Sequence, residues 1–250
     1  MTINQPLIKL ALTLFICAGS IAACASAIAD TAGQPVVLEL FTSQGCSSCP
    51  PADELMGALA ANPKVLPLSF HIDYWDRLGW KDPYSSREST ERQGNYAKAM
   101  GLDSVFTPQL IVDGALSVVG SNESDVREAI VTAGKSPRPY NIGIQPEKTG
   151  GGLDITVSAE KTPASPGGLD IVEIRFVSQA RTDVTAGENT GRNLESVNNV
   201  TSINFLGKCR DERCSYKSSP LRSPDDGIAV IAQSPDYGHI LGSAAYKTSR

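Results

Sequence analysis

In the first half of the chain, short apolar runs alternate with amphipathic segments. Runs rich in β-forming residues at 36–41 and 65–73 predict two buried strands. Apolar residues at helical spacing predict a helix at 50–61. We also expect a polar helix at 88–100 and a helix at 123–133 that Gly134 ends. Because the first helix lies between the first two strands, we expect those strands to be parallel and joined by a crossover.

A hairpin is expected in the same half of the chain. Residues 110–112 and 116–119 are short apolar runs on either side of Asp113-Gly114, a dipeptide that strongly favours a tight turn. The predicted order over residues 35–135 is therefore β-α-β-α-β-β-α, an α/β domain with antiparallel strands at one sheet edge.

After residue 139 the pattern changes to short alternating runs separated by Gly, Pro and Ser clusters. These runs are NIGIQ, LDITVSA, LDIVEIRFVS, VTSINFL and GIAVIAQ. Such a pattern predicts strands and no helix. We therefore expect a second, mostly β, sandwich-like domain at residues 140–250, with the boundary near residues 135–139.

Residues 1–29 have the features of a signal peptide. Lys9 precedes an apolar run, and Ala27-Ile28-Ala29 forms an A-x-A cleavage signal. The run is too short and too rich in small residues for a membrane span. Cleavage at the lipoprotein-like box before Cys24 would instead leave a lipid anchor at Cys24. Either route predicts an exported bacterial protein, periplasmic or secreted.

The bulk composition excludes one class of partner. The chain is 41% hydrophobic and 20% charged, as in ordinary globular proteins, and its net charge is −5. It has no Lys/Arg patch of the kind that nucleic-acid-binding proteins carry. We therefore expect no nucleic-acid partner.

Four cysteines remain once the signal peptide is removed, and an even number in an oxidising compartment predicts two disulfides. Cys209 and Cys214 enclose four polar residues, which suits a structural disulfide on a hairpin, with a second redox pair as the alternative. Cys46 and Cys49 are two residues apart, a spacing shared by redox pairs, metal sites and structural disulfides.

The context of Cys46 and Cys49 favours the redox interpretation. The stretch FTSQGCSSCPPAD follows a predicted strand and opens a predicted helix. If the helix begins just after Gly45, Cys46 lies in its first turn, where free N–H groups lower the pKa of a thiol. Cys49 then lies one turn on, and Pro50 fits the first helical turn.

A proline about sixty residues later strengthens this interpretation. Thr107-Pro108 lies just before the strand LIV, where a trans proline would mark the start of the strand. The cysteine motif at the first helix, the element order and Thr107-Pro108 together resemble the thioredoxin superfamily. This resemblance implies a cis peptide bond before Pro108, which we expect in place of the trans form.

A narrower resemblance is carried by FTSQGCSSCPPAD, HIDYWDRLGWKDPYSSRES and FTPQLIVDG, within residues 35–135. These motifs, together with GENTGRNL…VNNV, resemble a family of secreted bacterial proteins classed as a domain of unknown function. The resemblance implies a thioredoxin-like fold and no established substrate. Ser47 and Ser48 differ from the Gly-Pro, Pro-His or Pro-Tyr of better-known redox motifs, so the redox poise does not carry over.

Several further residues are candidates for the same site. Glu39 is a carboxylate in the apolar strand VVLELF. By analogy with the buried acid of thioredoxins it would accept the proton of Cys49; alternatively it bonds to a nearby Arg or hydroxyl. Tyr74, Trp75 and Trp80 lie in one loop and, with Thr107, would form a peptide-docking rim, or else they pin that loop to the domain.

A metal site is the competing interpretation. His71 ends the second predicted strand, at the sheet end that carries the cysteine loop, so Cys46, Cys49 and His71 would supply three ligands for copper or zinc. Alternatively, His71 is a strand histidine held by hydrogen bonds.

The sequence therefore predicts an exported thiol–disulfide oxidoreductase that needs no cofactor. Cys46 and Cys49 form its redox pair, Pro108 shapes its substrate groove, and its partners are protein or peptide thiols and disulfides. The alternatives are copper or zinc delivery and a non-catalytic binding protein with a structural Cys46–Cys49 disulfide.

Overall fold

The computed structural model describes residues 34–159 and 167–248, together with Met1. The predicted signal peptide, including Cys24, lies outside this range apart from Met1. Within the part of the chain that the structure describes, no helix is long and apolar enough to cross a membrane.

The first half has the predicted order β-α-β-α-β-β-α, with one added 3-10 turn. Its strands are β1 (Val36–Thr42), β2 (Val65–His71), β3 (Gln109–Val112) and β4 (Leu116–Val119). Its helices are α1 (Pro50–Leu59), η1 (Asp76–Leu78), α2 (Arg87–Met100) and α3 (Glu123–Ala133). Strand β1 pairs in parallel with β2 and antiparallel with β3, as the crossover and the hairpin require.

Strand β1 is buried along its whole length because both of its faces are covered. Leu38 and Leu40 pack in one apolar cluster with residues of α1 and α3. Val37 and Phe41 point to the other face and pack in a second cluster with Tyr96 of α2. This double burial explains why β1 is apolar at every position except Glu39 and Thr42.

The second half consists of strands in the described residues, as predicted. They are β5 (Tyr140–Pro146), β6 (Leu153–Ala159), β7 (Leu169–Asp183), β8 (Asn193–Cys209), β9 (Arg213–Ser218), β10 (Gly227–Gln233) and β11 (Ile240–Lys247). Strands β5, β6 and β9 form a small sheet. Its apolar face packs against β7 and β10 through residues such as Ile155 and Val230.

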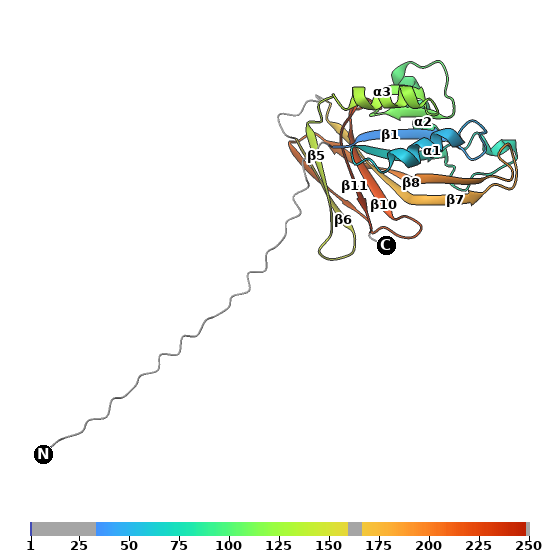
Figure 1. The fold of residues 1–250 in the computed structure, drawn as a ribbon. Helices are drawn as coiled ribbons and strands as arrows, with labels where there is room; N and C mark the ends of the chain where they lie inside the picture. The colour runs from blue at the N-terminus through green and yellow to red at the C-terminus, as the bar shows by residue number, and fades with distance from the viewer. Residues whose placement is uncertain (2–33, 160–166, 249–250) are drawn as a thin grey trace. The chain divides into compact units, whose positions relative to one another are not determined.

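The larger sheet is shared by the two halves of the chain. Its eight strands have the order β11-β10-β7-β8-β2-β1-β3-β4, so four strands of the second half extend the sheet of the first (Figure 1). The junction is a parallel pairing of Ser69 with Asn199. The Asn198 side chain donates a hydrogen bond to the Pro67 carbonyl across this junction, at 2.6 Å. The architecture is a large mixed sheet with helices and a second small sheet, and the two predicted domains share the large one.

This shared sheet predicts that a substitution in the second half destabilises the first. Asn198 is buried and has a left-handed backbone, with φ +47°. Asn198→Ala removes the bond to Pro67 and the bond that Asn198 Oδ1 accepts from Lys247 at 2.9 Å. It also places alanine in a left-handed conformation that asparagine adopts more readily. We expect the free energy of unfolding to fall by about 2–3 kcal/mol.

Urea unfolding followed by tryptophan fluorescence checks this prediction, since Trp75 and Trp80 both lie in the first half. Arg210→Ala, at an exposed position just after β8, is the control and should change the free energy by less than about 0.5 kcal/mol. An unchanged tryptophan transition in Asn198→Ala would show that the two halves unfold independently.

Candidate functional site

A disulfide joins Cys46 and Cys49 in the loop between β1 and α1, with 5.4 Å between the two Cα atoms. The pairing is the one that the sequence predicted. Both cysteine side chains are completely buried, at 0% exposure, whereas Ser47 and Ser48 between them are exposed. The disulfide therefore lies just beneath the surface of the molecule.

The expected position of Cys46 in the first turn of the helix is wrong. Helix α1 begins at Pro50, and Cys49 is its N-cap. Cys46 lies in a separate turn, where its N–H donates to the Ser43 carbonyl at 3.1 Å. The prolines occupy the first helical turn, as predicted.

Two hydroxyl groups contact the sulfur of Cys46. Thr107 Oγ1 lies 3.4 Å and Ser48 Oγ 3.3 Å from Cys46 Sγ. Thr107 Oγ1 also accepts a hydrogen bond from the indole N–H of Trp75, at 2.8 Å, so its own proton is free to point to the sulfur. The peptide bond between Thr107 and Pro108 is cis, as predicted.

The three aromatic residues of the predicted rim do not make the same kind of contact. Trp75 reaches the disulfide through Thr107, and the indole N–H of Trp80 donates to Gln44 Oε1 at 3.1 Å, in the cysteine loop. Tyr74 instead packs against the apolar core. Both tryptophans thus hold the cysteine loop, and their role in docking a peptide stays a prediction.

Asp82 ties the aromatic loop to the cysteine loop. Its Oδ2 accepts from the backbone N–H of Gln44, at 2.8 Å, and contacts Nδ1 of His71 at 2.7 Å. Burial alone would raise the pKa of Asp82, but His71 and backbone N–H groups outweigh it and lower that pKa. Asp82 is therefore an ionised, buried carboxylate.

His71 is held by hydrogen bonds on both sides of its ring. Nδ1 contacts Asp82, and Nε2 contacts Asn199 Oδ1 at 2.8 Å. Burial disfavours the charged imidazole, but the Asp82 carboxylate outweighs it, so the pKa of His71 is raised. With both nitrogens occupied, His71 is not brought to the cysteines as a third ligand. The described residues contain no group of three or more potential metal ligands, and the copper or zinc alternative stays a prediction.

Glu39 lies on the opposite face of β1 from α1. It forms an ion pair with Arg92, with Nε to Oε2 at 2.5 Å and Nη2 to Oε1 at 2.9 Å. The hydroxyl of Tyr96 also donates to Oε1, at 2.7 Å. Both carboxylate oxygens are thus occupied, and the structure does not bring Glu39 to the cysteine pair. Its contacts match the alternative of a carboxylate bonded to a nearby arginine.

A different acid, Asp53, lies next to the cysteine pair. It follows Cys49 by one turn of α1 and is 9% exposed. Its Oδ2 accepts from Thr42 Oγ1 at 3.3 Å, while the buried Oδ1 has no partner among the described residues. Burial raises the pKa of Asp53 from its ordinary value of 3.8 to about 7, although the nearby His71 opposes this shift. The spacing of four residues after Cys49 is a signal that sequence reasoning could have used.

The second half of the chain contributes a cover over the cysteine loop. We call residues 184–192, which join β7 to β8, the cap loop. The amide nitrogen of Asn189 donates to the carbonyls of Gln44 and Cys46, both at 2.9 Å. The carboxylate of Glu188 accepts from the Ser47 N–H at 3.2 Å. No local pattern in the sequence predicts these contacts, because the partners are more than 140 positions apart.

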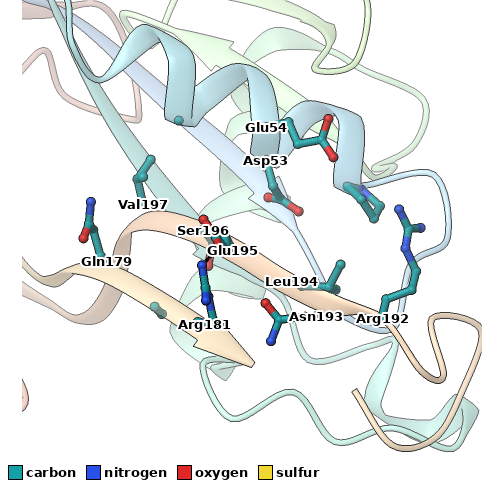
Figure 2. Close-up of a pocket in the computed structure, with 13 residues that line it drawn as sticks. Asp53, Glu54, Gln179, Arg181, Arg192, Asn193, Leu194, Glu195, Ser196 and Val197 are labelled. Carbon is teal, nitrogen blue, oxygen red and sulfur yellow. Dashed lines mark hydrogen bonds and ion pairs between the residues drawn. The ribbon is translucent and has the colours of Figure 1, made fainter. Parts of the chain in front are cut away.

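A cleft of about 680 Å³ lies beside the site, between α1 and the β7–β8 ribbon (Figure 2). The carboxyl group of Asp53 lies on its α1 side, and Arg181 and Glu195 lie on the side of the ribbon. Its volume is within the range of small-molecule sites. Its polar lining carries both signs of charge, so it favours no one ligand.

The second predicted disulfide is also present. Cys209 and Cys214 are bonded, with 5.7 Å between their Cα atoms, and link the end of β8 to β9. They lie at the opposite end of β8 from the cap loop. They are therefore not part of the site around Cys46.

Several solved structures match this chain to different degrees. A crystal structure of a protein from Agrobacterium tumefaciens matches with a TM-score of 0.73 and 28% sequence identity, over 88% of this chain and 97% of that chain. An endonuclease/exonuclease/phosphatase from Beutenbergia cavernae reaches a TM-score of only 0.23 at 14% identity, covering 43% of this chain and 23% of that one.

A comparison with curated proteins found no match. A family model described as "Protein of unknown function (DUF1223)" matches residues 37–233, which include the cysteine loop, the aromatic loop and the cap loop. The chain therefore belongs to this family.

Proposed function

We propose that the protein is a thiol–disulfide oxidoreductase that acts through Cys46 and Cys49. One observation carries the proposal: the disulfide ends at Cys49, the N-cap of α1, and the first turn of that helix holds Asp53, a buried carboxyl with a pKa of about 7. A group that titrates near the working pH is suited to accept and return a proton. A purely structural disulfide needs no such neighbour.

In the reduced protein, the thiolate of Cys46 attacks one sulfur of a substrate disulfide. The substrate S–S bond breaks, its other sulfur leaves as a thiolate, and Cys46 becomes part of a mixed disulfide. Cys49 then gives its proton to Asp53 and attacks Cys46 Sγ. The Cys46–Cys49 bond forms, and the second substrate sulfur leaves and is protonated. Two electrons pass from the protein to the substrate, and the reverse sequence oxidises a substrate dithiol.

The surroundings of Cys46 support its role as the attacking thiol. The hydroxyl groups of Thr107 and Ser48 lie within 3.4 Å of its sulfur and would donate to a thiolate. Hydrogen bonds to the charged form lower a thiol pKa. Cys49, the N-cap of α1, lies next to Asp53 and is suited to the resolving role.

The arrangement of the first half supports a thioredoxin-like assignment. Strands β2-β1-β3-β4 are neighbours in this order, with α1 and α3 on one face and α2 on the other. Pro108 follows Thr107, which contacts Cys46. Two disulfides suit an oxidising compartment, in line with an exported protein whose partners are protein or peptide thiols.

A fixed structural disulfide is the second candidate function, and one observation favours it. Both sulfur-bearing side chains are at 0% exposure, and structural disulfides are typically inaccessible. In this case Cys46–Cys49 would stiffen the loop of a binding protein.

The roles of the two cysteines predict a trapping result. Cys49→Ser should hold mixed disulfides with client proteins, because the resolving thiol is missing, and Cys46→Ser should hold none. Non-reducing electrophoresis after acid quenching of cells that express each variant measures this. Cys214→Ser is the control for an unrelated free thiol. Equal trapping in Cys46→Ser and Cys49→Ser, or none in either, would overturn the assigned roles.

The raised pKa of Asp53 predicts a kinetic pH dependence. Resolution of the mixed disulfide should speed up as pH rises through about 7, where the carboxylate forms. Asp53→Asn should lower the rate above pH 7 by roughly 10²-fold and abolish this rise. Stopped-flow release of a fluorescent peptide thiol reports the rate. An unchanged profile would exclude Asp53 as the proton acceptor.

The same pKa predicts an effect on stability with a definite sign. Asp53 ionises near 3.8 in the unfolded chain but near 7 in the folded protein, so its ionisation destabilises the fold as pH rises from about 4 to 7. Asp53→Asn should therefore increase the free energy of unfolding at pH 8, by up to about 4 kcal/mol, and change it less at pH 4. Urea unfolding at both pH values measures this, with the exposed Glu54→Gln as the control. A gain at pH 4 equal to that at pH 8 would contradict the assignment.

A further inference from the structure

We propose that the cap loop, residues 184–192, selects extended polypeptides as the substrates of the Cys46–Cys49 disulfide, with Asn189 as the specificity-determining residue. The proposal rests on the proposed function and names the substrate class of that site. It begins from the burial of the disulfide. Exchange requires a thiolate to approach one sulfur directly, and neither cysteine side chain is exposed.

The cap loop covers the cysteine loop through polar contacts to its backbone. Asn189 is 1% exposed, and its amide nitrogen donates to the carbonyls of Gln44 and Cys46. Its Oδ1 accepts from Arg192 Nη1 at 3.0 Å. Asn189 thus uses both its donor and its acceptor groups, which fixes its orientation.

The cap loop is closed on itself and does not depend on the cysteine loop for its shape. Val184 N donates to the Arg192 carbonyl at 2.9 Å, and Gly191 N donates to the Val184 carbonyl at 2.8 Å. Gly187 and Gly191 have left-handed backbones, with φ of +75° and +80°. These hydrogen bonds lie within the cap loop and would stay intact if the loop moved away from the disulfide, a movement that would also separate Gly187 from the adjacent Trp80.

The backbone groups that hydrogen-bond to the cap loop indicate which kind of ligand could take the place of that loop. Asn189 and Glu188 satisfy two carbonyls and one N–H of the backbone, on Gln44, Cys46 and Ser47. An extended polypeptide carries N–H donors and carbonyl acceptors at short, regular intervals and can satisfy all three. The side-chain amide of Asn189 thus occupies the place of a substrate peptide group. A small thiol has no peptide groups. To reach the disulfide it must displace the cap loop, and it then leaves these three backbone groups without hydrogen-bond partners.

The expected result is a change in the ratio of two rates. Oxidised protein is treated with excess dithiothreitol or with excess of an extended peptide that carries two cysteines, and disulfide reduction is followed by alkylation and mass spectrometry. In each reaction the reductant forms its own disulfide, and Cys46 and Cys49 become thiols. Asn189→Ala should accelerate reduction by dithiothreitol at least 10-fold and reduction by the peptide by less. Thr185→Ala, an exposed position in the same loop, is the control.

Two results would overturn the proposal. If Asn189→Ala leaves the dithiothreitol rate within twofold of the native protein, the cap does not limit access. If both rates rise equally, Asn189 acts on the reactivity of the sulfur rather than on substrate choice. If Asn189→Ala fails to fold, Glu188→Ala serves instead, because it removes only the contact to Ser47. This variant should change the ratio of the two rates in the same direction. An unchanged ratio in Glu188→Ala counts against the proposal.

The experiment separates this proposal from the proposed function. A changed ratio of rates, with no client trapped by Cys49→Ser, would support the cap and count against exchange in the cell. Trapped clients with an unchanged ratio would overturn the cap alone.

Discussion

The carboxylate of Asp82 fixes the loop on which the whole site depends. It is buried, and it joins three segments by accepting from the Gln44 backbone and the Tyr84 backbone and by contacting His71. A buried charge is costly unless it is paired and hydrogen-bonded, and here His71 supplies the opposite charge. Gln44, once placed, binds Trp80 and Thr182 through its side chain and Asn189 through its carbonyl. Asp82 therefore anchors the loop that carries the disulfide, and Ser43 and Asn189 hold Cys46 within that loop.

The same ionic network sets the acidity of Asp53. Burial raises its pKa, and the positive charge that Asp82 maintains on His71 limits the increase, so that the group titrates near pH 7. Glu39 is also buried, but it is paired with a cation, because Arg92 lies within hydrogen-bonding distance of both of its carboxylate oxygens. Burial alone thus does not identify a proton acceptor. Among the residues that the structure describes, Asp53 has no cationic partner in direct contact, and this distinguishes it from Glu39.

Much of the fold could be predicted from local patterns. The buried strands, the amphipathic helices and the Asp113-Gly114 turn each depend on neighbouring residues, and their order is as expected. The shared sheet could not be predicted in this way, because the pairing of Ser69 with Asn199 joins segments 130 positions apart. For the same reason the motif GENTGRNL, part of which lies in the cap loop, carries no local signal of the contact between Asn189 and Cys46. The predicted start of α1 is wrong because Cys46 belongs to a separate turn before the Cys49 N-cap.

The reduction potential of the Cys46–Cys49 pair tests the central claim most directly. The mature protein is equilibrated in glutathione buffers, its thiols are trapped by alkylation, and the peptide with both cysteines is analysed by mass spectrometry apart from Cys209–Cys214. An exchanging pair should have a potential between about −120 and −270 mV. A potential well below about −300 mV would identify a structural disulfide and contradict the assignment of the protein as an oxidoreductase.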